Sequence, residues 1–125
     1  MIEVRCLASG SSGNSYAVDD GKSVLLLEAG IPAKRILSGY LDLLSRVAGC
    51  LITHEHQDHA KGAAGLAAGG IDLYMTSGTF GGIESRYGEV RQSYRIHTVH
   101  AGEQFSLAGW IALPFQTEHD AAEPV

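Results

Sequence analysis

Short apolar runs separated by glycine-containing turns occupy the start of the chain. The segments Ile2–Ala8, Ser15–Asp19 and Lys22–Glu28 each contain enough β-branched and apolar residues for a strand. Asp20-Gly21, between the second and third segments, is a strong hairpin signal because this dipeptide suits the left-handed backbone of a tight turn. We therefore expect the second and third strands to form an antiparallel pair.

Helical and strand-like patterns alternate in the middle of the chain. Pro32 is well placed as the first residue of a helix, and apolar residues near helical spacing predict one broken or two short helices up to Val47. The apolar and β-branched residues Cys50–Thr53 predict a short buried strand. Small side chains predict a helix over Ala60–Ala68, which Gly69-Gly70 would end.

The last part of the chain returns to mostly strand-like patterns. The remaining predicted elements are a strand over Asp72–Met75, a helix over Ser77–Tyr87, and strands over Tyr94–Val99, Glu103–Leu107 and Trp110–Thr117. Strands that alternate with helices in this way predict an α/β (α+β) fold, with a mixed sheet packed against helices as one layer of a sandwich.

Length and charge limit the classes of protein that need to be considered. A chain of 125 residues with 45% hydrophobic and 18% charged residues corresponds to one globular domain at most. A net charge of −5 argues against an extended basic face for nucleic acid, although bound divalent ions would still allow a phosphate substrate. Met1–Arg5 lacks a signal-peptide pattern and no apolar run reaches membrane-spanning length, so we expect a cytoplasmic protein.

The most distinctive stretch is His54-Glu55-His56-Gln57-Asp58-His59, directly after the predicted strand Cys50–Thr53. In an extended segment, side chains two residues apart point to the same side, so His54 and His56 can converge on one point. Asp58 and His59 can face a second point as the chain bends. Imidazole and carboxylate groups are ligands that Zn²⁺, Mn²⁺ and iron favour. The stretch therefore predicts a site for one or two divalent metal ions, Zn or Mn.

This motif resembles the second motif of the metallo-β-lactamase superfamily. Ser9–Ser15, Leu25–Gly30 and Ile52–His54 resemble the bacterial exonuclease branch of that superfamily, whose founding member is encoded beside a cell-wall two-component regulator. The resemblance implies a mixed sheet with helices on one face, which is half of an αβ/βα sandwich. Since the complete family domain has two such halves, residues 1–125 are expected to be a single truncated domain, the N-terminal half.

The resemblance also assigns roles to individual residues. The tripeptide that begins at His119 matches the position of a third histidine, which would join His54 and His56 around the first metal ion and leave one position open for water. Asp58 would act as the catalytic residue that orients this water. With His59, it would also hold a second ion.

Two further positions are expected beside the metal. Where the family has aspartate, this chain has Glu28. By resemblance, Glu28 would support the metal loop, residues 54–59, by contacting the metal ligands rather than the metal. Its extra methylene group leaves two outcomes open: the carboxylate reaches the loop, or it disturbs the site. The glycine-punctuated segment Ser9–Asn14 is either a flexible turn or a wall of the active site, in which Ser12 and Asn14 would bind the substrate.

Two functions are compatible with these residues. The first is a metal-dependent hydrolase, by resemblance a phosphodiesterase or DNA exonuclease, in which the ion lowers the pKa of a bound water to give a metal-bound hydroxide. The second is a non-catalytic metal-binding half-domain, favoured by Glu28 and by the lack of a candidate for the family's bridging aspartate and final histidine. A sheet covered on one face leaves its other apolar face exposed, so we expect a homodimer or a partner that supplies the other half.

Overall fold

An antiparallel meander begins the chain in the computed structural model, which describes residues 1–125. It consists of β1 (Glu3–Ala8), β2 (Ser15–Asp19) and β3 (Val24–Leu27). The carboxylate of Asp20 accepts hydrogen bonds from the backbone N–H groups of Lys22 and Ser23, each at 2.8 Å. Gly21 supplies the left-handed backbone, with φ of 91°. The antiparallel pair predicted around Asp20-Gly21 is confirmed.

Three parallel strands extend this meander into one mixed sheet. They are β4 (Val47–Leu51), β5 (Leu73–Met75) and β6 (Ile96–Thr98), and the sheet order is β1-β2-β3-β4-β5-β6. The strands β3 to β6 are parallel, and β1 has the same direction because two antiparallel pairings separate it from β3. The carboxyl ends of β1, β3, β4, β5 and β6 therefore lie at one edge of the sheet, where loops can assemble a site.

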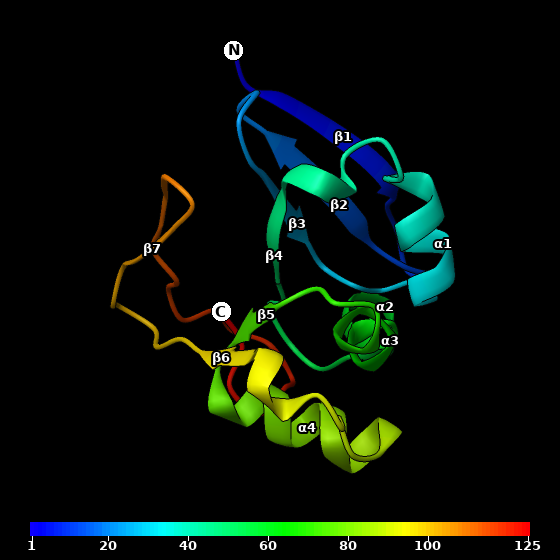
Figure 1. The fold of residues 1–125 in the computed structure, drawn as a ribbon. Coiled ribbons are helices and arrows are strands. Elements are labelled where there is room, and N and C mark those ends of the chain that lie inside the picture. The colour runs from blue at the N-terminus through cyan, green and yellow to red at the C-terminus, as the bar shows by residue number, and fades with distance from the viewer.

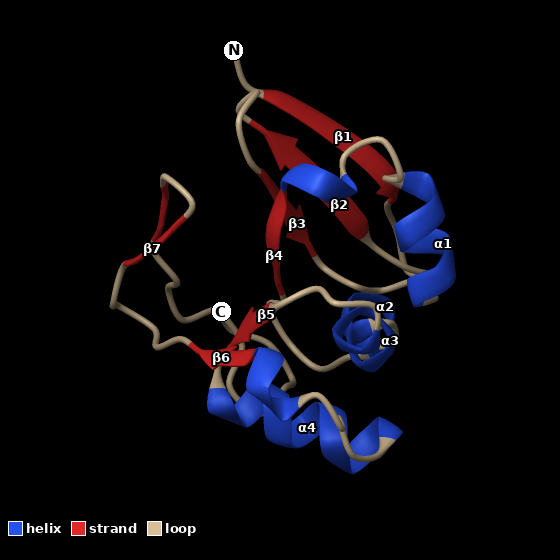
Figure 2. Ribbon diagram, viewed as in Figure 1, coloured by secondary structure: helices blue, strands red, loops and turns tan.

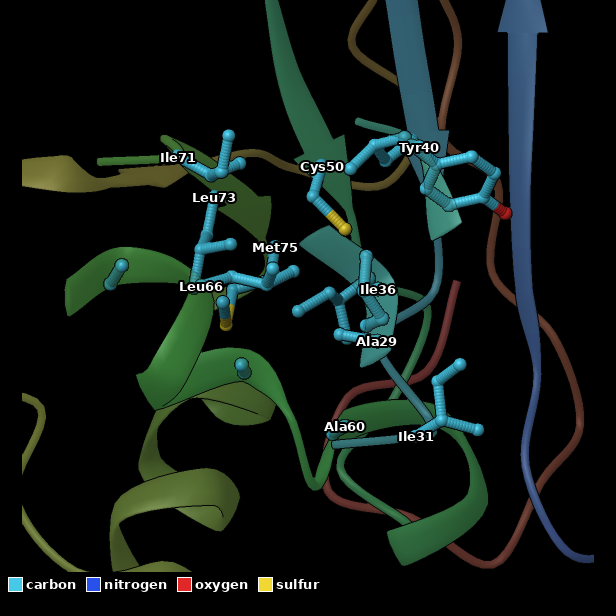
Figure 3. Packing of buried hydrophobic residues seen from close by; sticks show 14 of the residues in the cluster. Ala29, Ile31, Ile36, Tyr40, Cys50, Ala60, Leu66, Ile71, Leu73 and Met75 are labelled. Atoms are coloured by element: carbon cyan, nitrogen blue, oxygen red, sulfur yellow. The ribbon is translucent and has the colours of Figure 1, made fainter. Parts of the chain in front are cut away.

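All four α-helices pack on one face of this sheet (Figure 1). They are α1 (Ala33–Gly39), α2 (Gln57–Ala60), α3 (Ala63–Ala68) and α4 (Ser77–Tyr87), and short 3₁₀ helices span Leu44–Arg46 and Ser93–Arg95. Ile36 of α1 and Leu66 of α3 belong to the same buried cluster as Cys50, Leu73 and Met75 of the strands (Figure 3). Every helix falls short of the length and apolar character needed to cross a membrane.

The opposite face of the sheet is apolar and only partly covered. Leu27, Leu51 and Tyr74 point to this side, because neighbouring residues along a strand alternate between faces. The hairpin of β7 (Phe105–Leu107) and β8 (Trp110–Ala112) stands over it, apart from the six-stranded sheet (Figure 2). A cavity of about 520 Å³ remains between hairpin and sheet, and most of the residues that line it are hydrophobic. The predicted apolar face is thus present, but Leu27, Leu51 and Tyr74 are half-buried beneath the hairpin.

Among the element predictions whose bounds were wrong, hydrogen bonds explain the following two. The helix predicted over Ala60–Ala68 starts at Gln57 and is interrupted before α3, because the N–H of Gly62 donates to the carbonyl of Ala29 at 2.8 Å. The strand predicted over Trp110–Thr117 ends at Ala112. Pro114 has no N–H to donate, and its carbonyl accepts instead from Gly102 at 2.8 Å.

Candidate metal centre

Loops that follow β1, β3 and β4 are joined by backbone hydrogen bonds at the carboxyl edge of the sheet. The N–H of Gly30 donates to the carbonyl of Asn14 at 2.9 Å, and the N–H of Ala29 donates to the carbonyl of His59 at 2.8 Å. A Cβ atom on Gly30 would lie 1.8 Å from the carbonyl oxygen of Asp58. Only glycine allows the three loops to approach this closely, and this approach brings the histidine motif over the end of β3.

The structure brings four of the predicted histidines together. The ring centroids of His54 and His56 are 4.8 Å apart, and the ring of His119 lies 4.1 Å from the first and 4.8 Å from the second. One ligand nitrogen from each of these three rings lies within 4.8 Å of the other two, close enough to share a cation. The ring of His59 lies 4.1 Å from that of His54 on another side.

Hydrogen bonds define which nitrogen of His54 carries the proton. The hydroxyl of Thr53 donates to Oε2 of Glu28 at 2.7 Å, so its oxygen can accept from Nδ1 of His54, which lies 2.8 Å away. The lone pair is then on Nε2, the ligand form of a neutral imidazole. Burial, followed by the charge of the neighbouring imidazoles, lowers the pKa of His54 to about 4, so the ring is neutral at pH 7.

The donor set fits a divalent cation. The Nε2 atom of His54 is buried and has no hydrogen-bond partner. Leaving such an atom unpaired costs about 1–3 kcal/mol, and coordination would remove this cost. The nearby rings of His56 and His119 supply further nitrogen ligands of the kind that zinc and manganese accept.

Glu28 reaches the metal loop, which answers the alternative left open by its extra methylene group. Its Oε1 accepts from the N–H of Thr53 at 2.9 Å, and its Oε2 contacts Nδ1 of His59. The residue adopts a left-handed backbone with φ of 69°, rare for a residue other than glycine, and is only 7% exposed. Glu28, His54 and His59 are also close enough to share a cation. Because both carboxylate oxygens already accept hydrogen bonds, however, the geometry favours an orienting role for Glu28.

The substitution Glu28→Gln is expected to lower metal affinity by about 10–100-fold, the usual effect of losing a group that orients a ligand. A Gln side chain has one acceptor oxygen where Glu28 serves Thr53 and His59 with two. The same change should lower the metal-free unfolding free energy by about 1–3 kcal/mol. Calorimetric titration with Zn²⁺ measures the affinity. Glu103→Gln, at an exposed position, is the matched control, and equal affinities in both variants would contradict the assignment.

The other predicted site residues lie around this cluster. The side chain of Asp58 is 31% exposed, and its Oδ2 lies 3.4 Å from Nε2 of His59. The amide group of Asn14 donates to the carbonyls of Gly10 and Asp58, each at 2.9 Å, which engages both of its hydrogens. Asn14 thus joins the first loop, which follows β1, to the metal loop. Its expected donation to a substrate stays a prediction. Ser12 is exposed on the same loop.

Thr53 was not anticipated from the sequence, although it joins Glu28 to His54. Its hydroxyl is the bridge between the two side chains, and its N–H ends the strand by donating to Glu28 instead of to a neighbouring strand. A polar β-branched residue between a buried strand and a histidine was the available signal. This signal indicated the end of a strand, but it did not indicate which side chains Thr53 would contact.

Comparisons with known proteins agree with the fold and with the family that the sequence resembles. The family model described as the β-lactamase superfamily domain matches residues 25–124. Among characterised proteins, the exodeoxyribonuclease WalJ of Streptococcus pneumoniae is 37% identical over 124 residues, covering 94% of this chain and 46% of WalJ. The exodeoxyribonuclease YycJ of Bacillus anthracis is 32% identical over 123 residues, covering 95% of this chain and 46% of YycJ. The chain therefore spans about half the length of these relatives.

Solved structures share the architecture at lower sequence identity. The metallo-β-lactamase SMB-1 bound to 2-mercaptoethanesulfonate has a TM-score of 0.74 and 17% identity. The match covers 97% of this chain and 53% of that one. At this identity the likeness concerns the fold alone. The mixed sheet with helices on one face corresponds to about half of a metallo-β-lactamase chain.

Proposed function

The chain belongs to the β-lactamase superfamily, whose family model spans residues 25–124, and from this premise we propose that it forms the metal-binding half of a hydrolase that cleaves phosphodiester bonds in DNA. The observation that carries the proposal is the buried, unpaired Nε2 of His54 among the rings of His56 and His119. In a purely structural role, that nitrogen would accept a hydrogen bond from a donor. A cation explains its environment.

The proposed roles follow from the geometry of the side chains. His54, His56 and His119 hold the first ion. His59, whose Nε2 lies 3.4 Å from Oδ2 of Asp58, would hold a second ion together with that carboxylate. A bound divalent ion would supply charge that polarises water and a phosphate oxygen. Asp58, with its partly exposed carboxylate, orients the water and accepts its proton at an oxygen atom. Glu28 keeps the proton on Nδ1 of His59, so that Nε2 faces the site.

The substrate class rests on the relatives and on charge. WalJ and YycJ are both named as exodeoxyribonucleases, and this chain matches each over more than nine-tenths of its own length. The net charge of −5 leaves phosphate recognition mainly to the cation and to donors on the first loop. We propose that exposed Ser12 is one such donor, since its loop is tied to the metal loop through Asn14.

A combined metal and activity measurement tests this function. Protein dialysed against Zn²⁺ or Mn²⁺ should retain at least one ion per chain by elemental analysis. It should also hydrolyse bis(p-nitrophenyl) phosphate and short single-stranded DNA, with activity lost in a chelator and restored by metal. Retention of metal without cleavage of either substrate would contradict the proposed hydrolase function and favour a non-catalytic metal-binding half-domain.

The half-domain alternative is favoured by the open apolar face of the sheet. The cavity beside Leu27, Leu51 and Tyr74 is lined mostly by hydrophobic residues, and nearby Leu113 and Phe115 are 58% and 69% exposed. We propose that the 125-residue chain covers this face with a second copy of itself, since large exposed apolar patches are rare on monomers.

Light scattering at micromolar concentration should therefore give the mass of a dimer. Phe115→Ser should shift the equilibrium toward monomer, whereas Tyr94→Ser, at an exposed ring that does not line the cavity, should leave the dimer intact. A well-folded monomer of the unmodified chain would contradict self-association.

A further inference from the structure

The third histidine stands on a loop that lacks regular secondary structure. His119 is exposed, and the chain from residue 113 to residue 125 contains no helix or strand. Its ring nevertheless lies 4.1 Å from that of His54. Contacts elsewhere on the loop must therefore determine where His119 points.

Glu55 provides the first of these contacts. It lies between His54 and His56 in the sequence, but its side chain points away from them and is 3% exposed. Its Oε2 accepts the backbone N–H of Ala122 at 2.9 Å. Helix α4 packs against it so tightly that a Cβ atom on Gly82 would lie 2.5 Å from its Cγ. Glu55 thus links the histidine motif to the terminal loop, residues 113–125.

Glu123 provides the second contact, at the first turn of α4. Its Oε1 accepts the backbone N–H of Gly78 at 2.8 Å, which satisfies an N–H that the helix itself leaves free. Its backbone carbonyl accepts from the hydroxyl of Thr76 at 2.7 Å. The carboxylate also opposes the positive end of the helix dipole. The loop is therefore fixed on α4 as well as on the metal motif.

We propose that Glu55 and Glu123 are positioning residues that hold the terminal loop and thereby present His119 to His54 and His56. The proposal rests on the proposed metal function for its purpose, but the anchoring it describes belongs to the metal-free chain. Both glutamates act through hydrogen-bond acceptance by one carboxylate oxygen. Glutamine keeps such an oxygen, and alanine removes it.

The test uses the variants Glu55→Ala, Glu123→Ala, Glu55→Gln and Glu123→Gln of the whole chain. Glu118→Ala is the matched control, because Glu118 is exposed on the same loop and its side chain makes no hydrogen bond or ion pair. Amide hydrogen exchange of residues 118–125 is measured without metal, and Co²⁺ affinity is measured by visible absorption. His119→Ala provides the reference spectrum for a site without the third ring, and circular dichroism checks that each variant is folded.

Both alanine variants should exchange the loop amides at least about 10-fold faster and bind Co²⁺ about 10–100-fold more weakly, with spectra like that of His119→Ala. The glutamine variants and Glu118→Ala should behave as the unmodified chain. Faster exchange with unchanged Co²⁺ affinity would overturn the positioning role, and so would unchanged exchange. If the unmodified chain binds no Co²⁺, the proposed function fails, and loop exchange alone then decides whether the glutamates hold the loop. If one alanine variant does not fold, the other decides.

Discussion

Replacing His56 with alanine is expected to abolish metal-stimulated hydrolysis of bis(p-nitrophenyl) phosphate by the 125-residue chain. His56 contributes one of the two rings that accompany the unpaired nitrogen of His54, and its Nε2 also contacts the carbonyl of Asp120 on the loop that carries His119. Losing a residue that only orients a ligand usually lowers affinity or activity by 10–100-fold, so losing a ligand should lower both by at least about 100-fold. Initial rates at saturating Mn²⁺ or Zn²⁺ measure the effect.

The matched control is His100→Ala, which removes an exposed imidazole that belongs to neither group of side chains close enough to share a cation. This variant should keep the rate and the metal content of the unmodified chain. Hydrolysis that survives in His56→Ala with its metal dependence intact would mean that the catalytic ion is bound elsewhere.

Replacing Gly30 with alanine is expected to lower the unfolding free energy of the metal-free chain by about 3 kcal/mol or more, the upper end for overpacked sites. The new Cβ would lie 1.8 Å from the carbonyl oxygen of Asp58 and 2.6 Å from the backbone nitrogen of Asn14. These are backbone atoms that no side-chain rotation can move. The loops would have to separate, which also removes the bonds that bring the histidine motif over β3.

Urea denaturation followed by circular dichroism measures this loss, and Gly81→Ala is its control. Gly81 lies within α4, and a Cβ atom there would have no neighbour within 4 Å. Alanine at a free helical position should stabilise the chain by about 0.5–1 kcal/mol. Equal denaturation midpoints for the two variants would contradict the close approach at Gly30.

The sequence predicted the parts of this fold that depend on local patterns. The hairpin at Asp20-Gly21 and the helix over Ser77–Tyr87 are confirmed. The strand predicted over Cys50–Thr53 instead runs from Val47 to Leu51. Glycine is unfavourable in strands, so Gly49 concealed the start of β4. In the structure, the ring of Tyr74 occupies the space that a side chain at residue 49 would fill.

Long-range contacts explain which features of the site could not be predicted from the sequence. The spacing of His54 and His56 predicted a shared target, and the resemblance suggested His119 as its third member. No pattern indicated that Glu55 would hold the N–H of Ala122, which lies 67 residues further along the chain. Nor did any local signal show that the carboxylate of Glu28 would contact His59. That contact depends on how closely Gly30 lets the loops approach.

The separation between the histidine motif and the terminal loop has a consequence for biosynthesis. Asp120, whose carbonyl contacts His56, is added to the growing polypeptide 64 residues later. At translation rates of about 5–20 residues per second, this interval lasts about 3–13 s. During that time, the ribosome-bound chain lacks the ring of His119, so the proposed first site would bind a cation only weakly. Metal loading at the proposed first site is therefore expected to wait until residues 119–123 have left the ribosome and can settle on α4.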